Sequence, residues 1–176
     1  GTERVVSVKA NYFADVLVYD VTIIVTDGKK FNTFFPLSDR VKVINLGLNF
    51  EELWNVSFFK KILLYLKKQR KYERLLTNEL LRIRPDVTIT TLRREINFLN
   101  SINDGSKKIG ELHLSRTNYR RIDFRFSRYY EKLFFKWWKD RIVDSLEQLD
   151  KLVVLTDDAV SEWSELTNVN MIPDPL

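Results

Sequence analysis

The chain has 176 residues, of which 44% are hydrophobic and 30% are charged, a composition typical of one globular domain with a real core and not of a disordered chain. It contains no cysteine, which excludes disulfide bonds and cysteine zinc sites and favours a reducing compartment, so we expect a cytoplasmic protein. The net charge of +5 is modest, and no apolar run reaches the roughly 18 residues of a membrane-spanning helix.

The chain begins with "GTER", which predicts a helix capped by Thr2, with Val6, Ala10 and Phe13 on one face. The free N–H groups and the dipole of a helix N-terminus that follows a glycine can bind a phosphate. An ordinary capped helix explains the same residues, so one glycine leaves both interpretations open.

Six apolar, β-branched runs predict buried strands along the chain. They are Val21–Val25, Val41–Leu46, Val87–Thr91, Lys108–Leu114, Leu152–Thr156 and Asn168–Ile172. Helical apolar stripes lie between most of them: Phe59, Ile62, Leu66, Leu76, Leu80 and Ile83 before Pro85, then Ile142, Leu146 and Leu149, then Val160, Trp163 and Leu166. This alternation predicts an α/β fold, with a Rossmann-like, mostly parallel sheet that helices cover on both faces.

Ligands of open α/β sheets bind beyond the carboxyl ends of the strands. Two groups of residues that follow predicted strands are therefore candidate sites. His113, the only histidine, lies near the end of the fourth run, where an imidazole can donate or accept a proton near neutral pH, although a structural role is the commoner one. Thr156 to Asp158, "TDD", offers a carboxylate pair for a metal, but a helix cap with acids in the first turn explains it better. We therefore predict no metal site, and we expect residues Asn103 to Ser106 to form an exposed loop.

One segment carries the basic character of the chain. Residues 116–141 contain nine lysines and arginines against three acids, so the segment has a charge of +6 and the remaining residues sum to −1. Its aromatic residues suit either single-stranded nucleic acid or an anionic membrane surface. Alternatively, half of them belong to the protein core, and the cations form the solvated face of the same helix. The candidate contact residues are Arg120, Arg121, Arg125, Arg128, Lys132, Lys136, Trp137 and Trp138.

Several enzyme classes lack their motifs. The chain has no Walker loop, no HExxH and no G-x-S-x-G, which excludes nucleotide hydrolysis through a P-loop, zinc hydrolysis of that type and serine-hydrolase chemistry.

Four short motifs follow one another along the chain: "GTER" at Gly1 to Arg4, "PD" at Pro85 and Asp86, "DKLVVLT" at Asp150 to Thr156 and "IPDP" at Ile172 to Pro175. In this order and spacing the chain resembles the N-terminal half of a retaining glycosyltransferase of the GT-B fold, in glycosyltransferase family four. The resemblance covers most of the chain outside residues 103–141. It implies a Rossmann-like acceptor-binding domain over residues 1–172 and the start of an interdomain connector at 173–176, with the donor-binding domain absent from this sequence.

The resemblance also implies roles for particular residues. The glycine loop, here Gly1 and Thr2, would approach the diphosphate of a nucleotide-sugar, and His113 would contact the transferred sugar. The nucleotide-sugar is a co-substrate, no other cofactor is implied, and the acceptor is a glycan or a lipid-linked sugar. Relatives that use lipid-linked acceptors imply peripheral contact with the inner face of an anionic membrane through the basic segment, and the fragment alone is expected to be inactive. These sugar partners are favoured over nucleic acid, but a non-enzymatic module that binds nucleic acid or another polyanion stays the alternative.

Two departures from the family are visible. The family's first strand, central in its sheet, would precede Gly1, which takes the place of the second glycine of the loop. The helix after that loop usually ends in a glycine turn, whereas "ADVLVYDVT" has no glycine.

Overall fold

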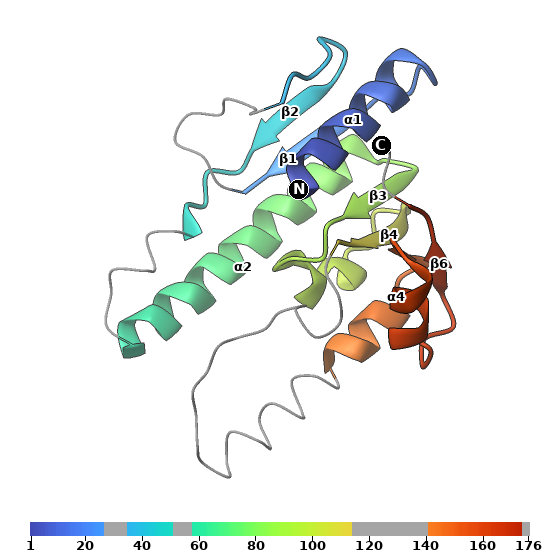
Figure 1. Cartoon of the computed structure of the whole chain (residues 1–176). Coiled ribbons are helices and arrows are strands. Elements are labelled where there is room, and N and C mark those ends of the chain that lie inside the picture. The colour runs from blue at the N-terminus through green and yellow to red at the C-terminus, as the bar shows by residue number, and fades with distance from the viewer. Residues whose placement is uncertain (27–34, 51–57, 114–140, 174–176) are drawn as a thin grey trace. The chain divides into compact units, whose positions relative to one another are not determined.

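The computed structural model describes residues 1–26, 35–50, 58–113 and 141–173 (Figure 1). The chain forms two compact units, one built on Gly1–Arg82 and one of Ile83–Pro173. Each unit has its own parallel sheet. The candidate residues Gly1 and Thr2 belong to the first unit and His113 to the second.

The first unit combines two helices with a pair of strands. Helix α1 (Thr2–Asp15) is followed by strands β1 (Thr22–Val25) and β2 (Lys42–Asn45), and then by the long helix α2 (Phe58–Ile83). The two strands are parallel, with Thr22 opposite Lys42. Ala10 and Ala14 of α1 pack against Val41 at the start of β2, so the small residues of the helix let it lie close to this strand.

Side chains of both helices bind the loops that flank β2. Asn11 on α1 donates from Nδ2 to the carbonyl of Pro36 at 3.0 Å and accepts at Oδ1 from the N–H of Ser38 at 2.8 Å. Lys68 on α2 donates from Nζ to the carbonyls of Leu48 and Asn49, at 2.6 and 2.9 Å. These bonds satisfy backbone groups that the short strand leaves outside its ladder.

Helix α1 ends without a glycine and with a strained residue. Val16 occupies the C-cap and donates its N–H to the carbonyl of Tyr12 at 3.0 Å. Two residues later Val18 adopts a φ of +58°, in the left-handed region that a β-branched residue rarely occupies. The chain therefore makes a left-handed turn after α1 in which the left-handed residue is a valine and not a glycine.

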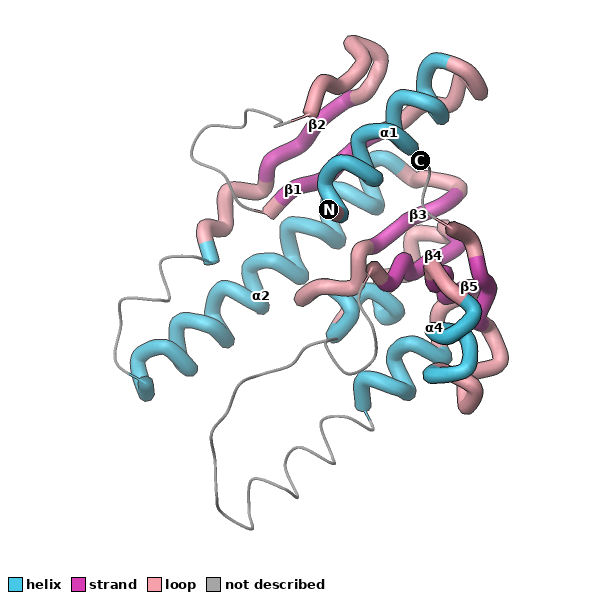
Figure 2. The backbone as a smooth tube through the Cα atoms, in the orientation of Figure 1, coloured by secondary structure: helices cyan, strands magenta, loops and turns pink. Residues whose placement is uncertain are grey.

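The second unit is a four-stranded parallel sheet in the order β3-β4-β5-β6 (Figure 2). Its strands are β3 (Val87–Thr90), β4 (Lys107–Leu112), β5 (Lys151–Val154) and β6 (Val169–Met171). The 3-10 turns η2 (Glu95–Asn97) and η3 (Leu99–Ser101) follow β3, residues 141–147 form a helix before β5, and α4 (Asp157–Glu162) connects β5 to β6. Every neighbouring pair is parallel, so the carboxyl ends of β3, β4 and β5 meet at one edge of the sheet.

The core of this unit lies against one face of the sheet. It is formed by Leu92, Ile96, Leu112, Ile142, Leu146, Leu149, Leu152, Val154, Trp163 and Leu166. Gly110 of β4 lies against this core so closely that a Cβ atom there would be 2.8 Å from methyl carbons of both Leu92 and Leu149. Only a glycine fits this position without a shift of those side chains.

The α/β class predicted from the sequence is confirmed, since parallel strands alternate with helices. Each of the six apolar runs overlaps one strand, with β4 and β5 beginning one residue earlier than predicted, and the helical stretch before Pro85 is α2. Four details differ from the prediction. The strands pair in two sheets and not in one, Leu66 of the α2 stripe is 50% exposed while Tyr72 is buried, and Gly1, not Thr2, caps α1. The buried residues of α1 are Val5, Ser7, Ala10 and Ala14, one position away from much of the predicted face.

Candidate functional site

His113 lies immediately after β4, at the carboxyl edge of the second sheet. Pairing holds the end of this strand on both sides, with Gly110 opposite Thr90 of β3 and Leu112 opposite Val154 of β5. The His113 side chain is only 8% exposed. The structure thus places the predicted histidine at the edge where open α/β sheets bind their ligands, on a well-fixed backbone.

A carboxylate that sequence reasoning missed accompanies this histidine. Glu111 Oε2 lies 3.5 Å from His113 Nε2, and the Glu111 side chain is also 8% exposed. The two residues are two positions apart in extended chain, so their side chains lie on the same face of the sheet. The sequence did offer a signal for this contact, namely a glutamate inside an apolar strand two residues before the histidine. A glutamate that is buried in a strand needs a partner.

A second buried glutamate organises the turn after β3. Glu95 Oε1 accepts a hydrogen bond from the Thr90 hydroxyl and one from the N–H of Arg93 at 2.8 Å. The Thr90 hydroxyl in turn accepts from the N–H of Leu92 at 3.1 Å, and Leu92 has a φ of +57°. These bonds stabilise a tight turn at the carboxyl edge, so the backbone beside the histidine's strand is fixed as well.

Gly1 and Thr2 occupy the start of α1 in the first unit. The carbonyl of Gly1 accepts from the N–H groups of Arg4 and Val5, at 3.1 and 3.4 Å, and no side chain caps the helix. The geometry is that of a helix N-terminus, where the dipole favours an anion. Whether these residues share a site with His113 stays a prediction.

The "TDD" segment is a helix cap. Thr156 has an extended backbone, and its hydroxyl accepts from the N–H of Ala159 at 3.2 Å, while Asp157 and Asp158 occupy the first turn of α4. Both acids are exposed. Among the described residues, no three histidine, cysteine or acidic side chains gather as a metal site would require.

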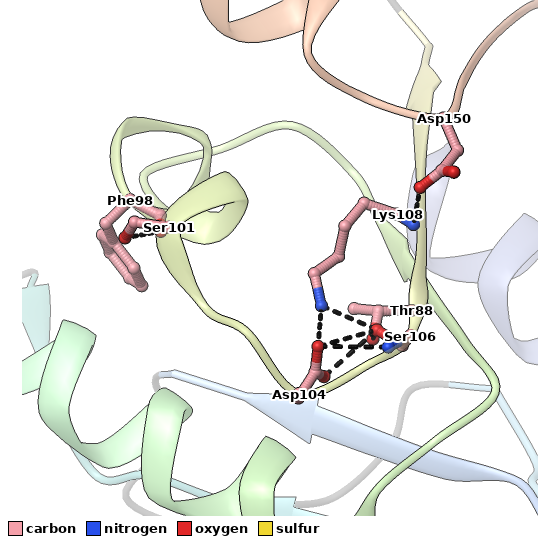
Figure 3. Close-up of polar contacts among 7 residues, drawn as sticks. All are labelled: Thr88, Phe98, Ser101, Asp104, Ser106, Lys108 and Asp150. Carbon is pink, nitrogen blue, oxygen red and sulfur yellow. Dashed lines mark hydrogen bonds and ion pairs between the residues drawn. The ribbon is translucent and has the colours of Figure 1, made fainter.

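A polar network lies at the opposite edge of the sheet, where the strands begin (Figure 3). Lys108 of β4 is buried, and its ammonium group contacts the carboxylate of Asp104 and the hydroxyl of Ser106, the latter at 2.7 Å. Ser106 also hydrogen-bonds Thr88 of β3 at 2.7 Å. The loop that the sequence predicts as exposed therefore turns one side chain inward, because the Asp104 side chain has no exposed surface.

Asp150 extends this network to β5. Its carboxylate accepts from the backbone N–H of Lys108 at 2.8 Å and from Nζ of the exposed Lys107 at 2.9 Å. The hydrogen bond to Asp150 raises the pKa of Lys107, and the same bond lowers the pKa of Asp150. Burial of Asp104 raises its pKa, but hydrogen bonds from Lys108 and Ser106 outweigh this effect, so its pKa lies below the ordinary value. We assign the network a structural role, since it ties together the starts of three strands.

A polar hollow of about 250 Å³ lies between the 3-10 turns and the helix at residues 141–147. Asn100 and Ser145 line it and are joined by a hydrogen bond of 2.7 Å from Asn100 Nδ2 to the carbonyl of Ser145. His113 and Glu111 are not among its lining residues.

The predicted contact residues of the basic segment lie outside the described residues. They are Arg120, Arg121, Arg125, Arg128, Lys132, Lys136, Trp137 and Trp138. In the part of the chain that the structure does describe, no helix has the length and apolar character needed to cross a membrane.

No protein-family model matches the chain, and no curated protein matches it.

Proposed function

We propose that this chain is the acceptor-binding domain of a retaining glycosyltransferase of the GT-B fold. The observation that carries the proposal is the place of His113, directly after a central strand of a parallel sheet and at its carboxyl edge. The family that the sequence resembles has a histidine at this place, in contact with the sugar that is transferred. The order of the four short motifs, from "GTER" to "IPDP", supports the same assignment.

The proposed reaction transfers a sugar from a nucleoside diphosphate to a hydroxyl of a glycan or lipid-linked acceptor. The bond between the anomeric carbon and the diphosphate oxygen breaks, the new bond forms to the acceptor oxygen on the same face, and the acceptor hydroxyl gives its proton to the nucleoside diphosphate, which leaves. His113 would bind a hydroxyl of the donor sugar. The anomeric configuration of the sugar is retained.

The test uses the protein that its complete gene encodes. Purified protein is incubated with UDP-glucose, UDP-galactose, UDP-N-acetylglucosamine or GDP-mannose, and binding is measured by saturation-transfer NMR and turnover by release of the nucleoside diphosphate. We expect binding of at least one donor, and a loss of turnover of about 100-fold or more in His113→Ala. Full turnover in that variant, or no donor bound by the intact protein, would contradict the proposal.

The charge of the basic segment favours a second candidate, a module that binds nucleic acid or another polyanion. This function predicts tight binding by the 176-residue chain alone, with log affinity falling linearly as log salt rises. A gel-shift titration at two salt concentrations distinguishes the candidates, because the glycosyltransferase needs no such binding.

A further inference from the structure

Helix α2, one long continuous helix (Figure 1), presents a row of cations on its exposed face. The members of the row are three or four positions apart, so they are neighbours on one face of the helix. Their side chains are exposed, and no hydrogen bond or ion pair joins these side chains to a residue that the structure describes. They are Lys67, Arg70, Lys71 and Arg74, which we call the α2 row.

Other side chains of α2 hold the helix in place. The opposite face is buried at Tyr72, Leu76 and Leu80. Lys68, which lies off the exposed face, donates to two backbone carbonyls, at 2.6 and 2.9 Å. A cation with a structural contact on this helix can thus be told apart from the α2 row, whose side chains face solvent.

The charge of α2 is unbalanced over its described side chains. Residues 63–83 contain six lysines and arginines against two glutamates, and one of these, Glu79, is already paired with Arg82 at 2.5 Å. Like charges three or four positions apart on a helix repel each other. A bound polyanion would offset this repulsion, so the α2 row has the charge complementary to such a ligand.

The other exposed side chains on this face indicate which polyanion it suits. Leu63 and Leu66 lie near one end and Leu81 near the other, and Leu66 and Leu81 are about 22 Å apart along the axis. Cations fill the turns between them, so the face lacks the continuous apolar stripe of a helix that lies in a bilayer. Among the described side chains of α2, no aromatic ring is exposed on which a nucleic-acid base could stack.

The spacing of the cations fits a glycan. Neighbouring side chains of the row start about 5–6 Å apart, close to the length of one sugar unit in an extended polysaccharide. We propose that the α2 row binds an anionic polysaccharide, with successive cations meeting the carboxylates of successive sugar units. That this polysaccharide is the acceptor chain rests on the proposed function. The binding itself does not.

The test measures binding of fluorescein-labelled polygalacturonate to the 176-residue chain by fluorescence anisotropy. We expect binding that weakens as the salt concentration rises, and no binding of labelled dextran, which is neutral. Changing the four residues of the α2 row to glutamine should weaken binding about tenfold or more, because four exposed contacts are lost together. Glutamine favours helix about as well as lysine and arginine do, so the variant should fold, which far-UV circular dichroism checks.

The matched control removes the same charge from other exposed positions. It changes four scattered cations to glutamine, namely Arg4, Arg40, Arg84 and Lys151. This control should bind polygalacturonate nearly as tightly as wild type. Equal weakening in the two variants would show attraction to net charge alone and would overturn the proposal, as would a wild-type chain that does not bind polygalacturonate.

Two competing ligands are tested with the same variants. Single-stranded DNA that binds more tightly than polygalacturonate, with binding lost in the α2 variant, would assign the row to nucleic acid and overturn the proposal. Anionic vesicles that bind wild type but not the α2 variant would overturn it in favour of a membrane. If the intact protein transfers no sugar, the proposed function fails, while binding of polygalacturonate by the 176-residue chain still decides the role of the α2 row.

Discussion

Two neighbouring lysines of β4 differ in burial, and this difference predicts their effects on stability. The Lys108 side chain is 8% exposed and contacts the fully buried carboxylate of Asp104, whereas the Lys107 side chain is 73% exposed. Lys108→Met would leave a buried carboxylate without its cation, and we expect the free energy of unfolding to fall by about 3 kcal/mol. Lys107→Met is the matched control and should stay close to wild type in urea denaturation. Equal losses in the two variants would contradict the structural role of the buried pair.

The same pair predicts a pH dependence of stability. Because hydrogen bonds lower the pKa of Asp104 in the folded chain, the unfolded chain, with a carboxyl pKa of about 3.9, takes up the proton first as the pH falls. This contribution to stability is therefore complete above about pH 4 and is lost as the pH falls through the lowered folded value. In urea titrations between about pH 6 and about pH 3, Asp104→Asn should lose less stability than wild type. Asp150, whose pKa is also lowered, still contributes to the dependence of stability on pH in that variant.

At the scale of one element, the conformation at the end of α1 predicts that a glycine in place of Val18 stabilises the folded chain. Val18 is 64% exposed and has a φ of +58°, which costs a β-branched residue about 1–2 kcal/mol. Val18→Gly removes this strain but adds freedom to the unfolded chain, so we expect a net gain of about 1 kcal/mol in the free energy of unfolding. Val16→Gly is the control, because Val16 has helical dihedral angles and its replacement should destabilise the chain. A loss of stability in Val18→Gly would contradict this reading of the turn.

The elements could be predicted from the sequence to a good extent, and the reasons are local. Runs such as "VTIIV" are apolar and β-branched, which favours strands in buried parallel sheets. The cap at Thr156 follows from its hydroxyl and the acids after it. The partners of Lys108 and Glu111 were missed because a lysine or glutamate is usually exposed, and burial depends on how strands and loops meet in space. Pairing in two sheets likewise depends on contacts that a single run does not encode.

Charge distribution is a property of the whole molecule, and it separates one segment from the rest. Residues 116–141 carry +6, and the remaining residues sum to −1. The four-stranded unit supplies the candidate histidine. A glycosyltransferase that uses a lipid-linked acceptor would need a surface for anionic lipid as well as a catalytic edge, and the basic segment suits that need.

We therefore expect the chain to bind anionic membranes through this segment. In co-sedimentation with vesicles, the chain should pellet with phosphatidylcholine containing phosphatidylglycerol and stay in solution with phosphatidylcholine alone. Changing Arg120, Arg121, Arg125 and Arg128 to glutamine should abolish pelleting, because each basic residue near the surface contributes about 1 kcal/mol.

The matched control changes the same number of exposed cations elsewhere, on α2, namely Lys67, Arg70, Lys71 and Arg74. Both variants lose the same net charge, so only a local surface distinguishes them. If both lose binding equally, attraction depends on net charge alone and the segment is not a contact surface. Pelleting with neutral and anionic vesicles alike, or with neither, would contradict the membrane assignment, and tight salt-dependent binding to nucleic acid would favour the polyanion module in its place.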